Sequence, residues 1–178
     1  MSRHLNSGWP QFNPATINFR RLFIVLFVLF FIIYSDQYTK SIAQKYLSGL
    51  SSVSFYSETV IFSYVENSGG FLGMVSEYPR YFQFFLLNIC VPVILLYCLY
   101  YLLFKKNLPA LHITTLSIIT GGGISNLLDR MINSGAVIDF IQIRIGLFKT
   151  GIFNLADIYI IGGSFLLGFL FLKSKPGE

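Results

Sequence analysis

Three aspartates within residues 121–157 are the side chains of this sequence best placed to do chemistry. Asp129, Asp139 and Asp157 lie in or beside strongly apolar runs. Charges at membrane depth are costly, so those that persist usually mark a transport pathway or a reaction site. Two carboxylates at hydrogen-bonding distance share one proton, so the ionised group can activate water while the protonated group polarises a peptide carbonyl. We therefore predict that Asp139 and Asp157 form a catalytic pair for peptide hydrolysis.

A serine–lysine pair is the competing catalytic arrangement. Ser41 and Lys45 are spaced i, i+4 on a possible helical extension. Neither residue stands in the buried setting that a lysine base requires. His4 and His112 are isolated, and the sequence contains no HExxH or Cys-x-x-Cys spacing. We accordingly expect no metal site and no cofactor.

The composition places the chain in the membrane class. Its 178 residues are 54% hydrophobic and only 12% charged, with a mean hydropathy of +0.64, whereas a soluble domain carries about a quarter charged residues. The net charge of +5 comes from basic residues scattered in ones and twos at the ends of apolar runs. That pattern is typical of membrane topology and excludes nucleic acid as the expected partner. Cys90 and Cys98 would lie about 12 Å apart along one helix, which is too far for a disulfide.

The apolar runs predict an all-α membrane protein with four transmembrane helices and a small β-rich extracytoplasmic segment between the first two. That segment has alternating β-branched and aromatic residues at 52–57 and 60–65, typical of short strands on the membrane surface. Pro92 is expected to kink the second helix. The predicted organisation is a tail (1–21), one membrane domain (22–172) with spans at about 22–42, 81–104, 110–128 and 152–172, and a second tail (173–178).

The first span has a competing interpretation as a cleaved signal peptide. Ser41-Ile42-Ala43 loosely resembles a cleavage site with small residues. Asp36 and Lys40 fall where a cleavable segment should be neutral, so we favour an uncleaved span. In the third span, Gly121, Gly122, Gly123 and Ser125 are small enough to let a neighbouring helix approach closely.

Charge placement predicts the orientation of these spans. Basic residues close to helix ends set topology, and acids contribute little. In a four-span topology, seven basic residues lie on one side of the membrane in short segments. This predicts that both tails are cytoplasmic and that the aspartate region faces outward. These residues are Arg3, Arg20, Arg21, Lys105, Lys106, Lys173 and Lys175.

Each acidic residue near the outer side also has a structural explanation when it is taken alone. Asp36 can pair with Lys40 four residues on, and Asp129 with Arg130 can be a solvated helix end. Asp157 suits the positive end of a helix dipole. Their collection at one end of a small bundle is harder to explain structurally, and this favours a reaction site.

Five motifs, in order from Asp36 to Asp157, make the chain resemble the lipoprotein signal peptidases (signal peptidase II), a family of bacterial membrane aspartyl proteases. They are similar to the family's D-x-x-T-K, N-x-G, G-G-A-x-G-N-x-x-D-R, V-x-D-F and F-N-x-A-D patterns. In this sequence they read Asp36-Gln37-Tyr38-Thr39-Lys40, Asn67-Ser68-Gly69, Gly121-Gly122-Gly123-Ile124-Ser125-Asn126-Leu127-Leu128-Asp129-Arg130, Val137-Ile138-Asp139-Phe140 and Phe153-Asn154-Leu155-Ala156-Asp157.

The resemblance implies a role for each matched residue. Asp139 and Asp157 would be catalytic, and Asn67 and Arg130 would hold the substrate backbone. Asn126 and Asn154 would line the substrate-binding site beside them, and Asp36, Lys40 and Asp129 would support the site. The resemblance also implies a monomer in the bacterial cytoplasmic (inner) membrane, in contact with lipid, that cuts prolipoproteins before a cysteine carrying diacylglycerol.

The sequence departs from the family pattern at three places. Gly70-Phe71-Leu72-Gly73 shifts a bulky residue by one position, Gly123 stands where alanine is usual, and Ser125 stands where glycine is usual. Because of the altered loop, a second interpretation stays open: the chain is a paralogue with a narrower substrate range or a role in inhibitor resistance. A small transporter subunit that uses Asp139 and Asp157 as a proton relay is the alternative from another class. A relay predicts charges spread through the bilayer depth, whereas these gather at one end.

Overall fold

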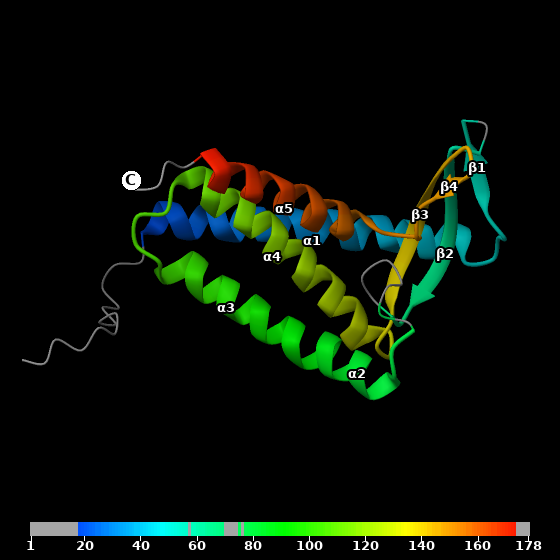
Figure 1. The fold of residues 1–178 in the computed structure, drawn as a ribbon, viewed down its shortest axis with the longest axis horizontal. Coiled ribbons are helices and arrows are strands. Elements are labelled where there is room, and N and C mark those ends of the chain that lie inside the picture. The colour runs from blue at the N-terminus through cyan, green and yellow to red at the C-terminus, as the bar shows by residue number, and fades with distance from the viewer. Residues whose placement is uncertain (1–17, 57, 70–74, 76, 174–178) are drawn as a thin grey trace, which may run out of the picture.

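Four long helices lie side by side, and a small antiparallel sheet crosses one end of the bundle (Figure 1). The computed structural model describes residues 18–56, 58–69, 75 and 77–173. Within these residues, four helices are long and apolar enough to cross a membrane. The predicted four helices and small sheet are therefore confirmed. Helix α1 begins, and helix α5 ends, at the end of the bundle opposite the sheet (Figure 1).

Helix α1 (Phe19–Leu47) is longer at both ends than its predicted span. The Asn18 side chain caps it, because its Oδ1 accepts hydrogen bonds from the backbone N–H groups of Arg20 and Arg21 at 3.0 and 3.4 Å. Its 29 residues give a length of about 43 Å, against about 30 Å for the hydrocarbon core of a bilayer. The part of the predicted tail at 1–17 lies outside the described residues.

The second span is interrupted before Pro92. It consists of α2 (Arg80–Phe85), the π-helical turn η3 (Leu86–Cys90) and α3 (Val91–Phe104). Proline lacks an N–H donor, and its ring collides with the carbonyl four residues earlier. The wider π turn accommodates that mismatch, so the expected kink takes the form of a π-helical segment.

Helix α4 (Ala110–Ile132) is the centre of the bundle. Of its most apolar window 44% is buried, compared with 11–17% for the other three spans. The three glycines at 121–123 face three different helices. A Cβ on them would lie 3.0 Å from Ile32 of α1, 2.8 Å from the Ala156 carbonyl oxygen of α5 and 2.6 Å from Leu95 of α3, respectively. The prediction that small residues permit close helix packing here is confirmed.

The sheet is built from two separate parts of the chain. Its order is β1 (Val53–Phe55), β2 (Val60–Asn67), β3 (Val137–Ile145) and β4 (Phe148–Lys149), with every neighbouring pair antiparallel. The two strands predicted between the first two helices are present, and two further strands, which were not predicted from the sequence, lie between α4 and α5. A two-stranded ribbon is only marginally stable by itself. Strand β3, which lies between α4 and α5 in the sequence, pairs along β2 and completes the sheet.

Candidate active site

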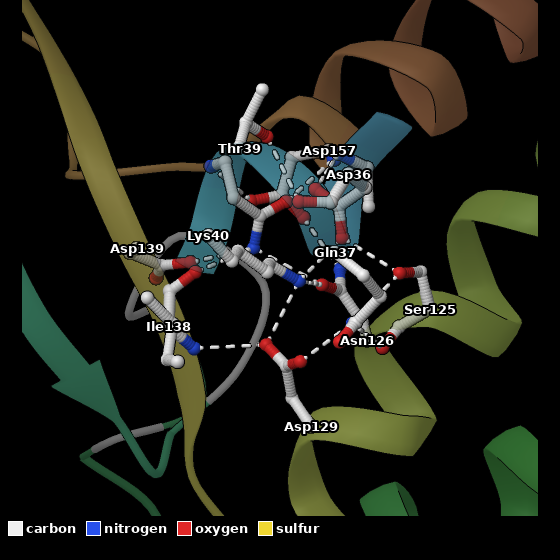
Figure 2. Close-up of polar contacts among 12 residues, drawn as sticks. Asp36, Gln37, Thr39, Lys40, Ser125, Asn126, Asp129, Ile138, Asp139 and Asp157 are labelled. Carbon is white, nitrogen blue, oxygen red and sulfur yellow. Dashed lines mark hydrogen bonds and ion pairs between the residues drawn. The ribbon is translucent and has the colours of Figure 1, made fainter. Parts of the chain in front are cut away.

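The predicted site residues come together where the sheet meets α1, α4 and α5 (Figure 2). They form two connected groups. One group is the set of ion pairs centred on Lys40, and the other places Asp139 and Asp157 around Asn154. The two groups meet at Asn126, whose side-chain oxygen accepts from both Lys40 and Asn154 at 2.9 and 3.0 Å.

The Lys40 cluster comprises Lys40, Asp36 and Asp129. The Lys40 ammonium lies 2.6 Å from Asp36 Oδ2 and 2.8 Å from Asp129 Oδ2, and all three side chains are at most 2% exposed. With the bond to Asn126, all three donors of the ammonium are used. The predicted Asp36–Lys40 pair is confirmed, and it is part of a larger buried cluster.

The two carboxylates of this cluster also hold the backbone beside the other two aspartates. Asp36 Oδ1 accepts from the N–H of Ala156 at 2.8 Å, and Asp129 Oδ2 accepts from the N–H of Ile138 at 3.0 Å. Ala156 directly precedes Asp157, and Ile138 directly precedes Asp139. The cluster thereby fixes the distance between the two chain segments that carry Asp157 and Asp139.

Asp157 is held at the start of α5 (Leu155–Lys173) by reciprocal capping bonds. The Asn154 side-chain oxygen accepts from the Asp157 N–H at 3.0 Å, and Asp157 Oδ2 accepts from the Asn154 N–H at 3.2 Å. This is a capping box with aspartate in place of the usual glutamate. The predicted helix start at 152 is wrong by three residues, because Phe153 exchanges backbone hydrogen bonds with Ile141 of β3 and Asn154 is the cap.

Asp139 is the third residue of β3, in the buried end of that strand, and is only 2% exposed. Its Oδ1 accepts from Asn154 Nδ2 and its Oδ2 from Asn67 Nδ2, each at 2.8 Å. Burial, which is the largest cause, and the charge of Asp157 together raise the pKa of Asp139 to about 7, against the lowering effects of the Asn67 and Asn154 bonds and of Lys40. Asp139 can therefore hold a proton near neutral pH.

Asn154 is the side chain shared by both aspartates. It is fully buried, donating to Asp139 through its amide and accepting from Asp157 through its oxygen. Asn126 holds the remaining oxygen of Asp157, at 3.0 Å. Because these amide groups are already bonded within the protein, their contacts favour a positioning role over direct contact with a substrate.

Arg130 is buried, and so is the neighbouring Asp129, at 9% and 2% exposure. The alternative interpretation of this pair as a solvated helix end is therefore wrong. The Arg130 Nη1 donates to the Asn126 carbonyl at 3.3 Å, while its buried Nε has no partner among the described residues. Arg130 is the site residue whose hydrogen-bonding capacity is least used.

Two further polar residues join the Lys40 cluster, and sequence reasoning assigned neither of them to the site. Gln37 Nε2 donates to Asp129 Oδ1 at 2.7 Å and to Ser125 Oγ at 3.0 Å. Ser125 Oγ donates to Asp36 Oδ2 at 2.7 Å. Ser125 could have been identified from the sequence, since it departs from the glycine of the family pattern. Gln37 occupies a variable position of its motif, so the motif gave no reason to assign it to the site.

The competing serine–lysine pair is not assembled. Ser41 and Lys45 are both exposed, and the Ser41 hydroxyl donates to the carbonyl of Tyr38 in its own helix. Among the described residues, no three His, Cys, Asp or Glu side chains are grouped as a metal site would require. The altered loop at residues 70–73 lies outside the described residues.

The chain is similar to known proteins over most of its length. Residues 28–173 match the family model of signal peptidase (SPase) II. The lipoprotein signal peptidase of Caldicellulosiruptor bescii is 38% identical over 143 residues, covering 80% of this chain and 87% of the relative. That of Caldanaerobacter subterraneus is 33% identical over 149 residues, covering 84% and 96%.

Solved structures agree with these sequence matches. A structure described as a bacterial membrane enzyme superposes with a TM-score of 0.67 at 25% identity and covers 88% of this chain and 94% of its own. A second structure with the same description gives a TM-score of 0.65 at 26% identity, covering 89% and 93%. The shared fold, the site at the end of the bundle and the sequence matches together show that this chain belongs to the signal peptidase II family, an aspartyl protease family.

Proposed function

We propose that this chain removes signal peptides from prolipoproteins by hydrolysis at the Asp139–Asp157 pair. Membership of the signal peptidase II family supports the substrate class and the reaction. The observation that supports the assignment of residues is that Asn154 holds both carboxylates. Its side-chain amide donates to Asp139, and its backbone N–H donates to Asp157.

The chemistry requires the pair to carry a single proton. Asp139, with its pKa raised to about 7, is the protonated partner and polarises the scissile carbonyl. Asp157 is the ionised partner and takes a proton from the attacking water, so that no covalent intermediate forms. Collapse of the tetrahedral intermediate needs a proton on the leaving amine, and the carboxyl group that has just received one supplies it.

The surrounding residues then divide into two roles. Asn154, Asn126 and the Lys40 cluster position the pair, because their polar atoms are bonded within the protein. Arg130 binds the substrate backbone through its unused N–H groups. Asn67 donates to Asp139 and, from the edge of the site on β2, also contacts the substrate strand.

The substrate fits a site at the membrane surface. The proposed substrate is a prolipoprotein whose cysteine carries diacylglycerol, cut just before that cysteine. Its lipid and its signal helix both lie in the bilayer, which suits a pair at the first turn of α5. In the proposed topology both tails are cytoplasmic and the sheet end of the bundle faces outward.

The gathering of charge at one end of the bundle favours hydrolysis over a proton relay. The buried acids Asp36, Asp129 and Asp139 all lie at the sheet end, whereas a relay needs titratable groups spaced through the membrane. A paralogue with a narrower substrate range differs from the leading proposal only in which prolipoproteins are cut.

The deciding experiment is reconstitution of the purified chain with a diacylglyceryl-modified prolipoprotein. Release of the signal peptide is expected with the modified substrate and not with the unmodified one. A narrowed paralogue would cleave only some members of a panel of prolipoproteins. Proton flux without cleavage, measured in the same liposomes, would replace the peptidase proposal by the relay.

A further inference from the structure

The end of the sheet farthest from Asp139 exposes large apolar side chains. We call this the sheet tip and define it by the residues of its two turns, Tyr56, Ile145, Leu147 and Phe148. Their exposures are 85, 68, 102 and 84%. A turn that faces water is ordinarily polar, so a group of unpartnered apolar side chains at adjacent turns marks an interaction surface.

The two turns of the tip lie together. Strand β1 pairs with β2 through Phe55↔Val60, and β3 pairs with β4 through Ile145↔Phe148, at the same end of the sheet. Figure 1 shows both turns at one edge of the molecule, to the side of the start of α5. The tip is therefore a compact surface made by two hairpins, set apart from the helices.

The sheet lies beside the last turns of α1. An apolar pocket of about 370 Å³ separates the last turns of α1 from β1 and β2, and Tyr46, Leu47, Val53 and Phe55 are among its lining residues. At about 43 Å, α1 is as long as a bilayer with both headgroup layers. Its last turns, with the exposed ring of Tyr46, and the sheet beside them thus lie in the headgroup layer.

The apolar surface of the tip continues the lipid-facing surface of the bundle. Phe55 is half exposed at the tip and also lines the pocket against α1. Arg144 and Lys149 pair across the base of the β3–β4 turn. Arg144 forms an ion pair with Glu58 at 2.7 Å, whereas Lys149 has no ion pair within the part of the chain that the structure describes. Lys149 therefore supplies a positive charge that suits anionic headgroups.

We propose that the sheet tip inserts into the outer-leaflet interface and binds anionic phospholipid, with Leu147 and Phe148 among the acyl chains and Lys149 at the phosphates. This inference rests on the proposed orientation in the membrane. Asp139 lies six residues before Ile145 on the same strand, a separation of about 20 Å. Lipid at one end of β3 and the Lys40 cluster at the other would together hold this strand parallel to the membrane.

The test uses tryptophan fluorescence of the full chain in liposomes and needs no substrate. Trp9, the one native tryptophan, is replaced by Phe, and Phe148→Trp provides the reporter. Ser51→Trp, on the exposed connection after α1, is the matched control. Brominated phosphatidylglycerol in phosphatidylcholine vesicles should quench the fluorescence of the Phe148→Trp protein at least about twofold more than that of the Ser51→Trp protein.

A second reporter, Tyr56→Trp, tests the other hairpin in the same way and replaces the first if Phe148→Trp does not fold. The proposal is overturned if both tip reporters are quenched by aqueous acrylamide and not by brominated lipid, which would mean that the tip faces water and serves a protein partner. Because the readout is independent of cleavage, it can fail while the peptidase proposal stands.

Discussion

Two pairs of aspartates lie at the same end of the bundle, and they differ in what stands between them. Between Asp36 and Asp129 stands the ammonium of Lys40, at 2.6 and 2.8 Å from their oxygens. Between Asp139 and Asp157 stands the neutral amide residue Asn154. Asp36, Asp129 and Asp139 are buried and Asp157 is half-buried, so the clearest difference between the pairs lies in the charge of the bridging group.

The bridging group decides what each pair can do. A lysine compensates buried negative charge and turns two carboxylates into a rigid structural element. Asn154 is neutral and adds no charge of its own to the two carboxylates that it orients, so in the proposed mechanism the pair holds one proton. The charged cluster is thus suited to support the site and the amide-bridged pair is suited to proton transfer.

The largest effect is expected at the amide-bridged pair. Asp139→Asn and Asp157→Asn keep the size of the side chain and one of its two hydrogen-bonded oxygens but cannot exchange the proton. Each should lower the rate of signal-peptide release by about 10²–10⁴-fold, which is typical of a general acid or base. The double variant should be hardly worse than either single one, because the two groups act as a unit.

The matching change in the charged pair is the control for this prediction. Asp129→Asn should lower thermal stability or yield more than it lowers the rate per folded molecule, because Asp129 bonds to Lys40, Gln37 and the backbone of Ile138. Wild-type rates in folded Asp139→Asn and Asp157→Asn proteins would rule out the pair as the catalytic group.

Removing the Lys40 ammonium should destabilise the Asp36–Asp129 pair. Lys40→Met leaves two buried carboxylates without their partner, a change that typically costs about 3–5 kcal/mol. Thermal unfolding in detergent should show a large loss of stability. Lys45→Met, one turn further along α1 at an exposed position, is the matched control and should unfold like the wild type. Equal stability of both variants would contradict the structural role of Lys40.

Proton binding by Asp139 should make stability fall as pH rises. Its pKa of about 7 in the folded protein lies above its ordinary value of 3.8, so between these values the folded state holds a proton that the unfolded chain releases. The stabilisation is complete below pH 4 and is lost as pH rises towards about 7. The charged groups facing it are Asp157 of α5, Lys40 of α1 and Arg130 of α4.

The difference in unfolding temperature between wild type and Asp139→Asn, measured from pH 4 to 8, isolates this contribution. The wild type should lose stability relative to the variant across that range. A parallel dependence in both proteins would place the titrating group elsewhere. Cleavage should also show a bell-shaped pH dependence, since only the singly protonated pair is competent.

Much of this arrangement could be predicted from the sequence, because short motifs report local requirements. The apolar runs predicted four helices, and the glycines at 121–123 predicted close packing, since both signals depend on a few neighbouring residues. The observed start of α5 could also have been predicted from the sequence. Asn154 followed three residues later by Asp157 is a capping-box signal, and it places the first helical residue at Leu155.

The remaining features depend on contacts between distant segments. β3 has an apolar sequence that is compatible with a helix or a strand, and only its pairing with β2 makes it a strand. Gln37 reaches Asp129 because α1 packs on α4, and no motif encodes that approach. Such residues appear only once the helices are placed against each other.

The smallest predicted effect concerns Ser125, where this chain departs from the family's glycine. Its hydroxyl donates to Asp36 and accepts from Gln37, so Ser125 and Gln37 form a second link between Asp36 and Asp129 beside Lys40. Ser125→Gly removes this link. Ser117→Gly is the matched control, since Ser117 lies on the same helix, is equally buried, and its hydroxyl has no partner among the described residues. Both variants lose about 0.5–1 kcal/mol by placing glycine in a helix.

The difference between the two variants measures the link itself. A hydrogen bond to a charged group contributes about 1.5–3 kcal/mol, so Ser125→Gly should be less stable than Ser117→Gly by an amount of that order. Gln37→Leu should lose less in the Ser125→Gly background than in the wild type, because the partners are shared. Since Lys40 still joins the two carboxylates, cleavage per folded molecule should change by less than about tenfold. Equal stability of the two glycine variants would mean that Lys40 alone holds Asp36 and Asp129 together. Ser125 would then add no stability at the position where the family has glycine.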